Sequence, residues 1–363
     1  MATLIFDEAN QAYQNFIESI KSQATRSIYK YCLLKYLKYK NYNDISQLFS
    51  KMDSKWIESD IIAYIVYLRK ARKLSHATLD LYSSAIIQFY LINDIQLNVK
   101  KINGYLGEYT KSVKDRAYTT EEIHKLLEFC DERTRCLVLL LASTGMRIGA
   151  VPSLRVGNLE KINEIYKITV YERSREEYYS FCTPECASAI DSYLEYRKRY
   201  GEKINDNSPL IREQFDINAI ERVNKARFIT RIGLDRLLDI ALNRSGLRER
   251  NKEIEGQAMR GRIRKNVARA HGFRKFATTN MVRTKVNAEA REMLLGHSIG
   301  LSDSYYRPDS SEILEEYMKA VDLLTINPEN RLKREVAELR IKSNDIQDLK
   351  NELDELRSII SKK

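Results

Sequence analysis

Two of the four histidines lie in unusual surroundings, His271 in HGFRKFATTNM and His297 in LLGHS. His271 and Arg274 are three residues apart on an expected helix, so they share a face and could hold one small anion. Arg147 follows a helix stop in STGMRIG, where Gly145 and Gly149 allow the backbone to approach a ligand closely. Each of these residues alone is more often an ordinary surface or core residue, so the prediction of a functional site depends on their combination.

The charge of the chain favours an acidic partner. The 363 residues include 61 Lys and Arg against 50 Asp and Glu, a formal net charge of +11. Between Arg244 and Lys275 there are eleven basic residues and three acidic ones. Because neutralising nucleic-acid phosphates releases their counterions, a cluster of this kind predicts a phosphate-binding surface on DNA or RNA.

The order of the motifs resembles the tyrosine recombinase (phage integrase and Xer-like) family. That family has an Arg in T-G-x-R, an H-x-x-R, a G-H and a nucleophilic tyrosine, which corresponds here to Tyr306, nine residues after His297. The resemblance is close over about residues 111–324. The helical segment before it is similar to the family's core-binding domain in kind and size only. The segment GLSDSYYRPDSSEILEEYMKAVDLLTI is most similar to archaeal members.

The resemblance implies a role for each motif residue. Arg147 and Arg274 would clamp the charge that develops on the phosphate oxygens. Either His271 or His297 would support activation of the phenol while the other donates to the phosphate. Tyr306 would attack, giving a 3′-phosphotyrosyl bond and a free 5′-hydroxyl, with no cofactor, metal or ATP. The neighbouring Tyr305 is the rival nucleophile, but the family spacing favours Tyr306.

One position departs from the family pattern. The family has a Lys in a hairpin turn, where it protonates the leaving 5′-oxygen, but this turn has the sequence ERSREE with Arg173 and Arg175. Arginine does not release its proton in proteins. We therefore expect that Arg173 or Arg175 acts through its charge, or that a lysine such as Lys167 or Lys265 reaches the site instead.

Three functions fit these residues. The first is a site-specific recombinase that works on double-stranded DNA as a homo-tetramer across two duplexes, in integration, excision or multimer resolution. The second is a type IB topoisomerase, which would share the nucleophile and act as a monomer. The third is a DNA-binding protein of recombinase descent without catalytic activity. The complete set of motif residues favours an enzyme, and the missing hairpin Lys weakly favours the third function.

The elements that must hold these residues are mainly helices. From about Glu8 to Val99 apolar and aromatic residues recur every three or four positions, with helix starts near Asp53 and Ser75. Thr119 or Thr120 begins a further helix. The alternating stretch YKITVYERSREEYYSFCT predicts a β-hairpin that turns around Ser174.

We thus predict a mainly α protein with a small β-hairpin or sheet: a helical core-binding domain followed by a mixed α+β catalytic domain. The expected ranges are 1–108 for the first domain, 109–118 for a linker, 119–326 for the catalytic domain and 327–363 for a terminal helix. Leu332, Leu339, Ile346, Leu353 and Ile360 recur every seven residues, which favours a short coiled coil or a packed helix.

Composition excludes several other classes of protein. With 43% hydrophobic and 31% charged residues the chain is typical of a folded protein. No apolar run approaches the ~20 residues that span a bilayer, and the N-terminus has no signal-peptide pattern. We expect a cytoplasmic, DNA-associated protein that makes no membrane contact.

Overall fold

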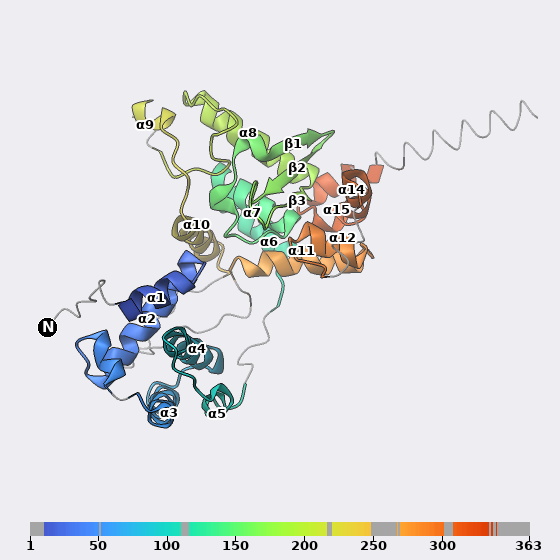
Figure 1. Cartoon of the computed structure of the whole chain (residues 1–363). Coiled ribbons are helices and arrows are strands. Elements are labelled where there is room, and N and C mark those ends of the chain that lie inside the picture. The colour runs from blue at the N-terminus through green and yellow to red at the C-terminus, as the bar shows by residue number, and fades with distance from the viewer. Residues whose placement is uncertain are drawn as a thin grey trace, which may run out of the picture. The chain divides into compact units, whose positions relative to one another are not determined.

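The computed structural model describes residues 11–50, 52–109, 116–215, 220–247, 269–300 and 308–333, together with the single residues 267, 335, 336 and 339. The chain divides into two compact units, Met1–Ser112 and Val113–Lys363 (Figure 1). Each has its own hydrophobic core. The units are therefore described separately.

The first unit is helical throughout its described part. Its elements are α1 (Gln11–Ser19), α2 (Gln23–Lys40), the 3₁₀ helix η1 (Ile45–Phe49), α3 (Ser54–Lys70), α4 (His76–Ile92) and α5 (Val99–Asn103). Asp53 and Ser75 cap α3 and α4 by accepting backbone N–H bonds within the first turn. Side-chain oxygens at this position replace hydrogen bonds that the first turn lacks, so the two expected helix starts are confirmed.

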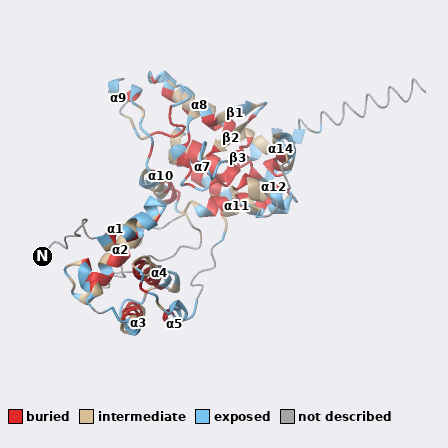
Figure 2. Cartoon of the chain, viewed as in Figure 1, coloured by how far each residue is buried: buried red, intermediate tan, exposed pale blue. Residues whose placement is uncertain are grey.

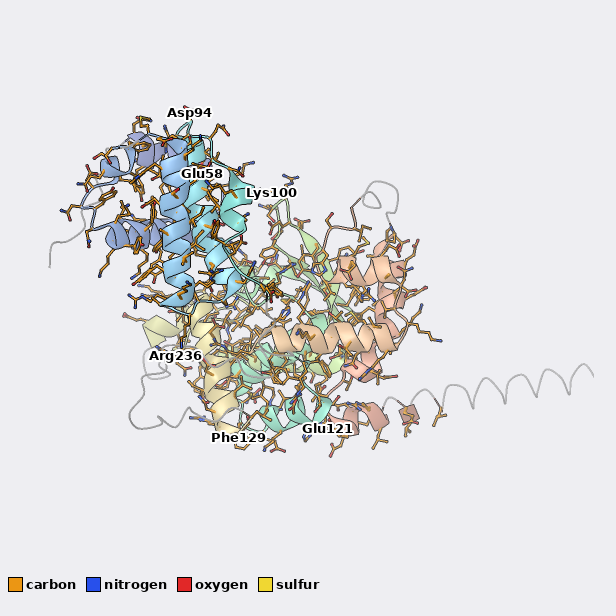
Figure 3. The ribbon with its side chains drawn as sticks, turned by 90° about the horizontal axis from the view of Figure 1, so that it is seen from below. Glu58, Asp94, Lys100, Glu121, Phe129 and Arg236 are labelled. Atoms are coloured by element: carbon orange, nitrogen blue, oxygen red, sulfur yellow. The ribbon has the colours of Figure 1, made fainter. Side chains whose placement is uncertain are left out.

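Tyrosines form much of the core of this unit. Tyr36, Tyr64 and Tyr90 are fully buried, and Figure 2 colours the buried residues of these helices red. Glu58, labelled in Figure 3, accepts hydrogen bonds from the backbone N–H of Asn98 and from Lys101, which attaches the start of α5 to α3. The three buried tyrosines, one from each of α2, α3 and α4, belong to the hydrophobic core of this unit.

The second unit surrounds one apolar helix. Every residue of α7 (Glu132–Thr144) from Cys136 onward is buried, and α7 packs against α8, α10, α11 and α15. The other helices are α6 (Thr120–Leu127), η2 (Val151–Ser153), η3 (Val156–Asn158), α8 (Pro184–Arg199), α9 (Ile220–Asn224), α10 (Arg231–Arg244), α11 (His271–Arg283), α12 (Ala288–Leu294), α14 (Ser310–Met318) and α15 (Val321–Leu324).

A three-stranded antiparallel sheet in the order β1-β2-β3 lies beside these helices (Figure 1). The predicted hairpin is β2 (Ile165–Val170) with β3 (Tyr178–Phe181), and its turn contains Ser174. The strand β1 (Leu159–Ile162) was not predicted, because the alternation of apolar and polar residues in LEKI is too short and weak to indicate a strand. Its turn onto β2 depends on Asn163, which adopts a left-handed conformation with φ of 51°. The mainly helical fold with a small sheet is confirmed.

Two of the expected ranges can be compared in part with the described residues. Tyr118, at the end of the expected linker, is buried in the core of the second unit, and its hydroxyl donates to the carbonyl oxygen of Arg269. Leu332 and Leu339, the first two heptad positions, are helical and exposed. The later heptads lie outside the described residues. Within the described part of the chain, no helix is long and apolar enough to cross a membrane.

Candidate active site

Arg274 is the centre of the site. It lies in the first turn of α11 and is 7% exposed. Its Nη1 donates to the carbonyl oxygen of Gly145 and its Nη2 to that of Leu295, both at 2.8 Å. One guanidinium therefore connects the end of α7, the start of α11 and the end of α12, although Gly145 lies 129 residues before Arg274 in the sequence and Leu295 lies 21 residues after it.

Gly145 makes this connection possible. It ends α7 in a left-handed conformation with φ of 63°. A Cβ at this position would lie 2.8 Å from the side chain of Leu295 and 2.9 Å from that of Ala277. Only glycine fits both the backbone conformation and the space, so the T-G-x-R motif brings its carbonyl oxygen to Arg274 and exposes Arg147 two residues later.

Arg147 is exposed and donates from Nη1 to the carbonyl oxygen of Gly296 at 3.2 Å. Both arginines thus bind the segment 295–297 through carbonyl oxygens. Burial lowers the pKa of Arg274, and the positive charge of Arg147 lowers this pKa further. Two cations that repel each other, and that no carboxylate contacts directly among the described residues, form a site that attracts an anion.

His297 lies between these arginines and an acid. Its Nε2 is 2.6 Å from Nη2 of Arg274, and its Nδ1 is 2.5 Å from Oε2 of Glu292. Burial would raise the pKa of the Glu292 carboxyl, but hydrogen bonds from His297 and Arg291 hold it below its usual range. Glu292 is therefore ionised at neutral pH. Glu292 was not among the predicted site residues, although its place five residues before His297, near the end of α12, could have indicated it.

Gly296, the residue before His297, packs against the β-hairpin. It has φ of 66°, and a Cβ there would lie 2.4 Å from the ring of Tyr178 on β3. The ring therefore packs directly on the glycine backbone. Burial raises the pKa of Tyr178 to about 12, so this side chain is neutral and contributes shape to the site.

A cavity of about 970 Å³ opens beside these groups. Arg147, Arg175 and His297 line it, as does Lys167 from β2. The structure thus brings together several of the predicted site residues. It also brings in Lys167, one of the two lysines considered as a replacement for the hairpin Lys.

Besides the buried Arg274, two other predicted residues are not in the described lining of this cavity. Arg173 has φ of 61°, its side chain is 90% exposed, and it borders a separate hollow beside Arg155 and Asp206. His271 is exposed at the first position of α11, one turn before Arg274. His271 and Arg274 were expected to share one face of the helix; in the structure His271 is exposed and Arg274 is buried.

The predicted nucleophile Tyr306, its rival Tyr305 and Lys265 lie outside the described residues. The segments on both sides of the tyrosines are described, and both reach the cavity: Ser298 and Ile313 belong to its lining. Among the described residues, no group of three or more His, Cys, Asp or Glu side chains could hold a metal ion.

Comparison with known families gives one match. The model of the phage integrase family matches residues 116–312, which include every motif that forms the site. No curated protein sequence matches the chain.

Several solved structures share the fold. The Tn1549 transposon integrase (aa 82–397), in complex with circular intermediate DNA, is 15% identical with a TM-score of 0.54, covering 85% of this chain and 98% of that one. XerH recombinase bound to a palindromic difH substrate, a post-cleavage complex, is 20% identical with a TM-score of 0.52, covering 80% and 78%. A lambda integrase tetramer bound to a Holliday junction is 12% identical with a TM-score of 0.50, covering 84% and 80%.

Proposed function

This chain belongs to the phage integrase family, and from that premise we propose that it is a tyrosine-type site-specific recombinase, which cleaves and rejoins double-stranded DNA through a 3′-phosphotyrosyl intermediate. One observation carries the proposal beyond family membership. Arg147 and Arg274, from separate motifs, are anchored on carbonyl oxygens next to His297, and neither contacts a carboxylate among the described residues, so both are available to an anion. A phosphodiester under attack develops charge on its non-bridging oxygens, which is what such donors stabilise best.

The reaction conserves the energy of the cleaved phosphodiester bond in a new ester bond to the protein. The phenol oxygen of Tyr306 attacks phosphorus and loses its proton, the bond between phosphorus and the 5′-oxygen breaks, and that oxygen takes up a proton. The strand stays attached through a phosphotyrosyl ester. The 5′-hydroxyl of another strand then attacks this ester and restores the tyrosine, so neither ATP nor a metal is needed.

Each site residue has a role in these reaction steps. Arg147 and Arg274 hold the non-bridging oxygens, and His297 donates a hydrogen bond to one of them. His271 assists the proton transfer from Tyr306. Arg175, which lines the cavity, replaces the family's hairpin Lys as an electrostatic contact to the leaving oxygen, and Arg173 contacts the DNA backbone.

We further propose that residues 1–108 form a DNA clamp with the catalytic range 119–326, and that residues 109–118 link them. Four copies would assemble on two duplexes, as the lambda integrase tetramer does on a Holliday junction. Residues 327–363, with their heptads, would serve this assembly. The positive charge of the chain supports activity on DNA. We place this activity in the cytoplasm. The similarity of the segment around Tyr306 to archaeal members supports a place among them.

Trapping of the covalent intermediate tests the proposal. The protein is incubated in EDTA with a random-sequence duplex pool that carries nicks, and the reaction is stopped with detergent. Mass spectrometry then identifies the peptide attached to DNA. We expect the adduct on Tyr306, its loss in Tyr306→Phe, and unchanged DNA binding by that variant. Tyr305→Phe is the matched control, and its adduct yield should stay within about threefold of the wild type.

The same experiment separates the other functions. An adduct on Tyr306 without strand exchange between duplexes, from a monomer, would favour a type IB topoisomerase. Normal DNA binding with no adduct on any tyrosine would favour a DNA-binding protein without catalytic activity, and the proposal would then be wrong.

A further inference from the structure

Glu292 holds His297 through two separate contacts. The backbone N–H of His297 donates to the carbonyl oxygen of Glu292 at 2.9 Å, while that of Gly296 donates to Met293 at 2.9 Å. This pair of hydrogen bonds, with Gly296 left-handed, is the Schellman end of a helix. The Glu292 side chain then returns to Nδ1 of the same histidine at 2.5 Å. The backbone and the ring of His297 are thus both oriented by one residue.

The partners of the ring determine which nitrogen carries the proton. Nε2 lies 2.6 Å from Nη2 of Arg274. A guanidinium has only donors, so Nε2 must accept, and it carries no hydrogen. The hydrogen of a neutral imidazole is therefore on Nδ1, where the Glu292 carboxylate accepts it. In the protein without DNA, His297 presents a lone pair toward the site.

A lone pair is the wrong group to meet a phosphate oxygen. We propose that Glu292 is a positioning residue that lets His297 take up a proton from solvent when DNA binds. The phosphate attracts Nη2 of Arg274 away from Nε2 of His297. Nε2 is then protonated, and its new N–H donates to a non-bridging oxygen. The Glu292 carboxylate stabilises the imidazolium. This inference rests on the proposed function, since the phosphate in question is that of the DNA.

The charges around His297 explain why the carboxylate is needed. Groups face the ring or the adjoining cavity from every element packed there: Arg291 and Glu292 on α12, Arg274 on α11, Arg147 after α7, and Lys167, Tyr171, Arg175, Glu176, Glu177, Tyr178 and Tyr179 on the hairpin. The cations among them disfavour a second positive charge on the ring. Glu292 is the acid that contacts the ring directly, so it carries most of the compensation.

Glu292→Gln tests the role of the charge. The amide oxygen of glutamine still accepts from Nδ1, so the tautomer is kept while the negative charge is lost. Single-turnover cleavage of the duplex identified by trapping is followed between about pH 6 and pH 9. The imidazolium is less stable in the variant, so cleavage should decline at a pH lower by about one unit than in the wild type. At about pH 6 the two rates should agree within about threefold.

Two further variants make the result specific. Glu292→Ala also removes the acceptor, and we expect a rate lower by about 10- to 100-fold at neutral pH. Glu289→Gln neutralises an exposed acid on the same helix and should keep the wild-type profile. If the profiles of Glu292→Gln and the wild type coincide, Glu292 has no electrostatic role and the proposal is overturned.

A measurement without activity keeps this inference distinct from the proposed function. The chain has only four histidines, so ¹⁵N NMR can assign the ring nitrogens of His297. We expect the Nδ1–H tautomer in the free wild type, and an Nε2–H tautomer would overturn the inference. If the wild type forms no adduct, the proposed function fails and so does DNA-linked protonation, while the NMR result still tests the tautomer that Arg274 and Glu292 together impose on His297. If the adduct forms and the profiles coincide, only this inference fails.

Discussion

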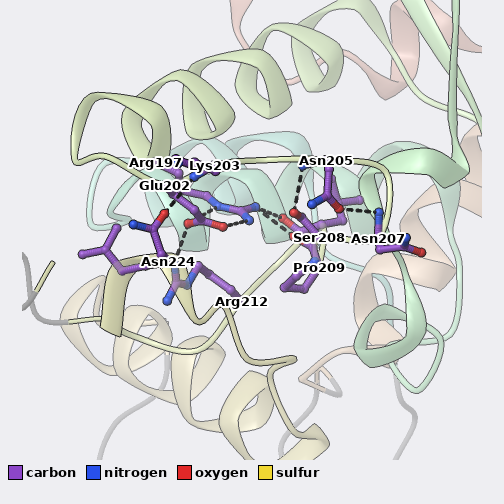
Figure 4. Close-up of polar contacts among 11 residues, drawn as sticks. Arg197, Glu202, Lys203, Asn205, Asn207, Ser208, Pro209, Arg212 and Asn224 are labelled. Carbon is purple, nitrogen blue, oxygen red and sulfur yellow. Dashed lines mark hydrogen bonds and ion pairs between the residues drawn. The ribbon is translucent and has the colours of Figure 1, made fainter. Parts of the chain in front are cut away.

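Two clusters in the second unit each combine two arginines with one glutamate, but they differ in what the arginines bind. In the first cluster Arg197 and Arg212 both donate to Glu202, and all three side chains are buried (Figure 4). In the second, within the described residues, neither Arg147 nor Arg274 contacts a carboxylate. Both arginines donate to carbonyl oxygens. Glu292 contacts His297, and His297 lies between Glu292 and Arg274.

The difference separates a structural cluster from a site. A carboxylate neutralises a guanidinium and fixes it, and a buried pair of this kind joins the loop after α8 to the segment that follows. A carbonyl oxygen also fixes the guanidinium, but it carries only a partial charge. Arginines held in that way keep their attraction for an anion. We infer that the partner of a buried arginine, more than its burial, indicates whether it is available to a ligand.

The largest expected effect concerns the structural cluster. Glu202→Gln leaves two buried arginines without their counter-charge, so the free energy of unfolding should fall by about 3–5 kcal/mol. Urea unfolding at neutral pH measures this loss. Glu195→Gln is the control, because its ion pair with Lys198 is exposed and should contribute at most about 1 kcal/mol. A loss below about 1 kcal/mol for Glu202→Gln as well would contradict a structural role for the cluster.

The same variant has a defined pH dependence. Burial raises the pKa of Glu202, but hydrogen bonds from Arg197 and Arg212 outweigh this effect, and its pKa lies below its usual value. A carboxyl of this kind stabilises the fold above the pKa of the unfolded chain, about 4.3, and the stabilisation is lost as the pH falls through the folded pKa. The difference in stability between the wild type and Glu202→Gln should therefore narrow below about pH 4.

Arg147→Ala should lower the rate of cleavage and leave the stability of the fold nearly unchanged. The side chain is exposed, so unfolding should change by less than about 0.5 kcal/mol. Cleavage should fall by about 10²- to 10³-fold, because one donor to the developing charge is lost. Arg135→Ala is the control, since Arg135 also donates to a carbonyl oxygen, that of Leu127, but does not line the cavity. If Arg135→Ala lowers cleavage as much as Arg147→Ala, the position of Arg147 at the cavity is not the cause of its effect, and its role at the phosphate is contradicted.

Local signals in the sequence predicted several of the elements. Asp53, Ser75 and the Thr119–Glu122 capping box begin helices, and Gly145 ends one. These signals succeed because a cap acts on hydrogen bonds a few residues away. β1 was missed because its pairing with β2 depends on a turn at Asn163 more than on its own residues.

The site was predicted less completely than the fold. The motifs identified Arg147, Arg274 and His297, but nothing in the spacing showed that Arg274 would be buried on carbonyl oxygens. Glu292 was missed because its role depends on the Schellman end of α12, where the chain turns back on itself. The Arg197–Glu202–Arg212 cluster was not predicted either, because its residues meet only through the path of the loops between them.

The smallest expected effect distinguishes Arg175 from Arg173. Both were candidates for the position of the family's hairpin Lys, and only Arg175 lines the cavity with Arg147 and His297. Arg175→Lys should keep or raise the cleavage rate, because an ammonium can release a proton to the leaving 5′-oxygen and a guanidinium cannot. Arg173→Lys and Arg173→Ala should each stay within about twofold of the wild type.

Single-turnover cleavage with two substrates measures this effect. One is the natural duplex, and the other has sulfur in place of the bridging 5′-oxygen, a leaving group that needs no proton. If Arg175→Lys acts as a proton donor, its gain should appear on the oxygen substrate and vanish on the sulfur one. Lys167→Ala completes the comparison, because Lys167 is the lysine among the described cavity residues. A loss for Lys167→Ala that sulfur restores, with no gain for Arg175→Lys, would assign the proton to β2 and leave the hairpin turn with a purely electrostatic role.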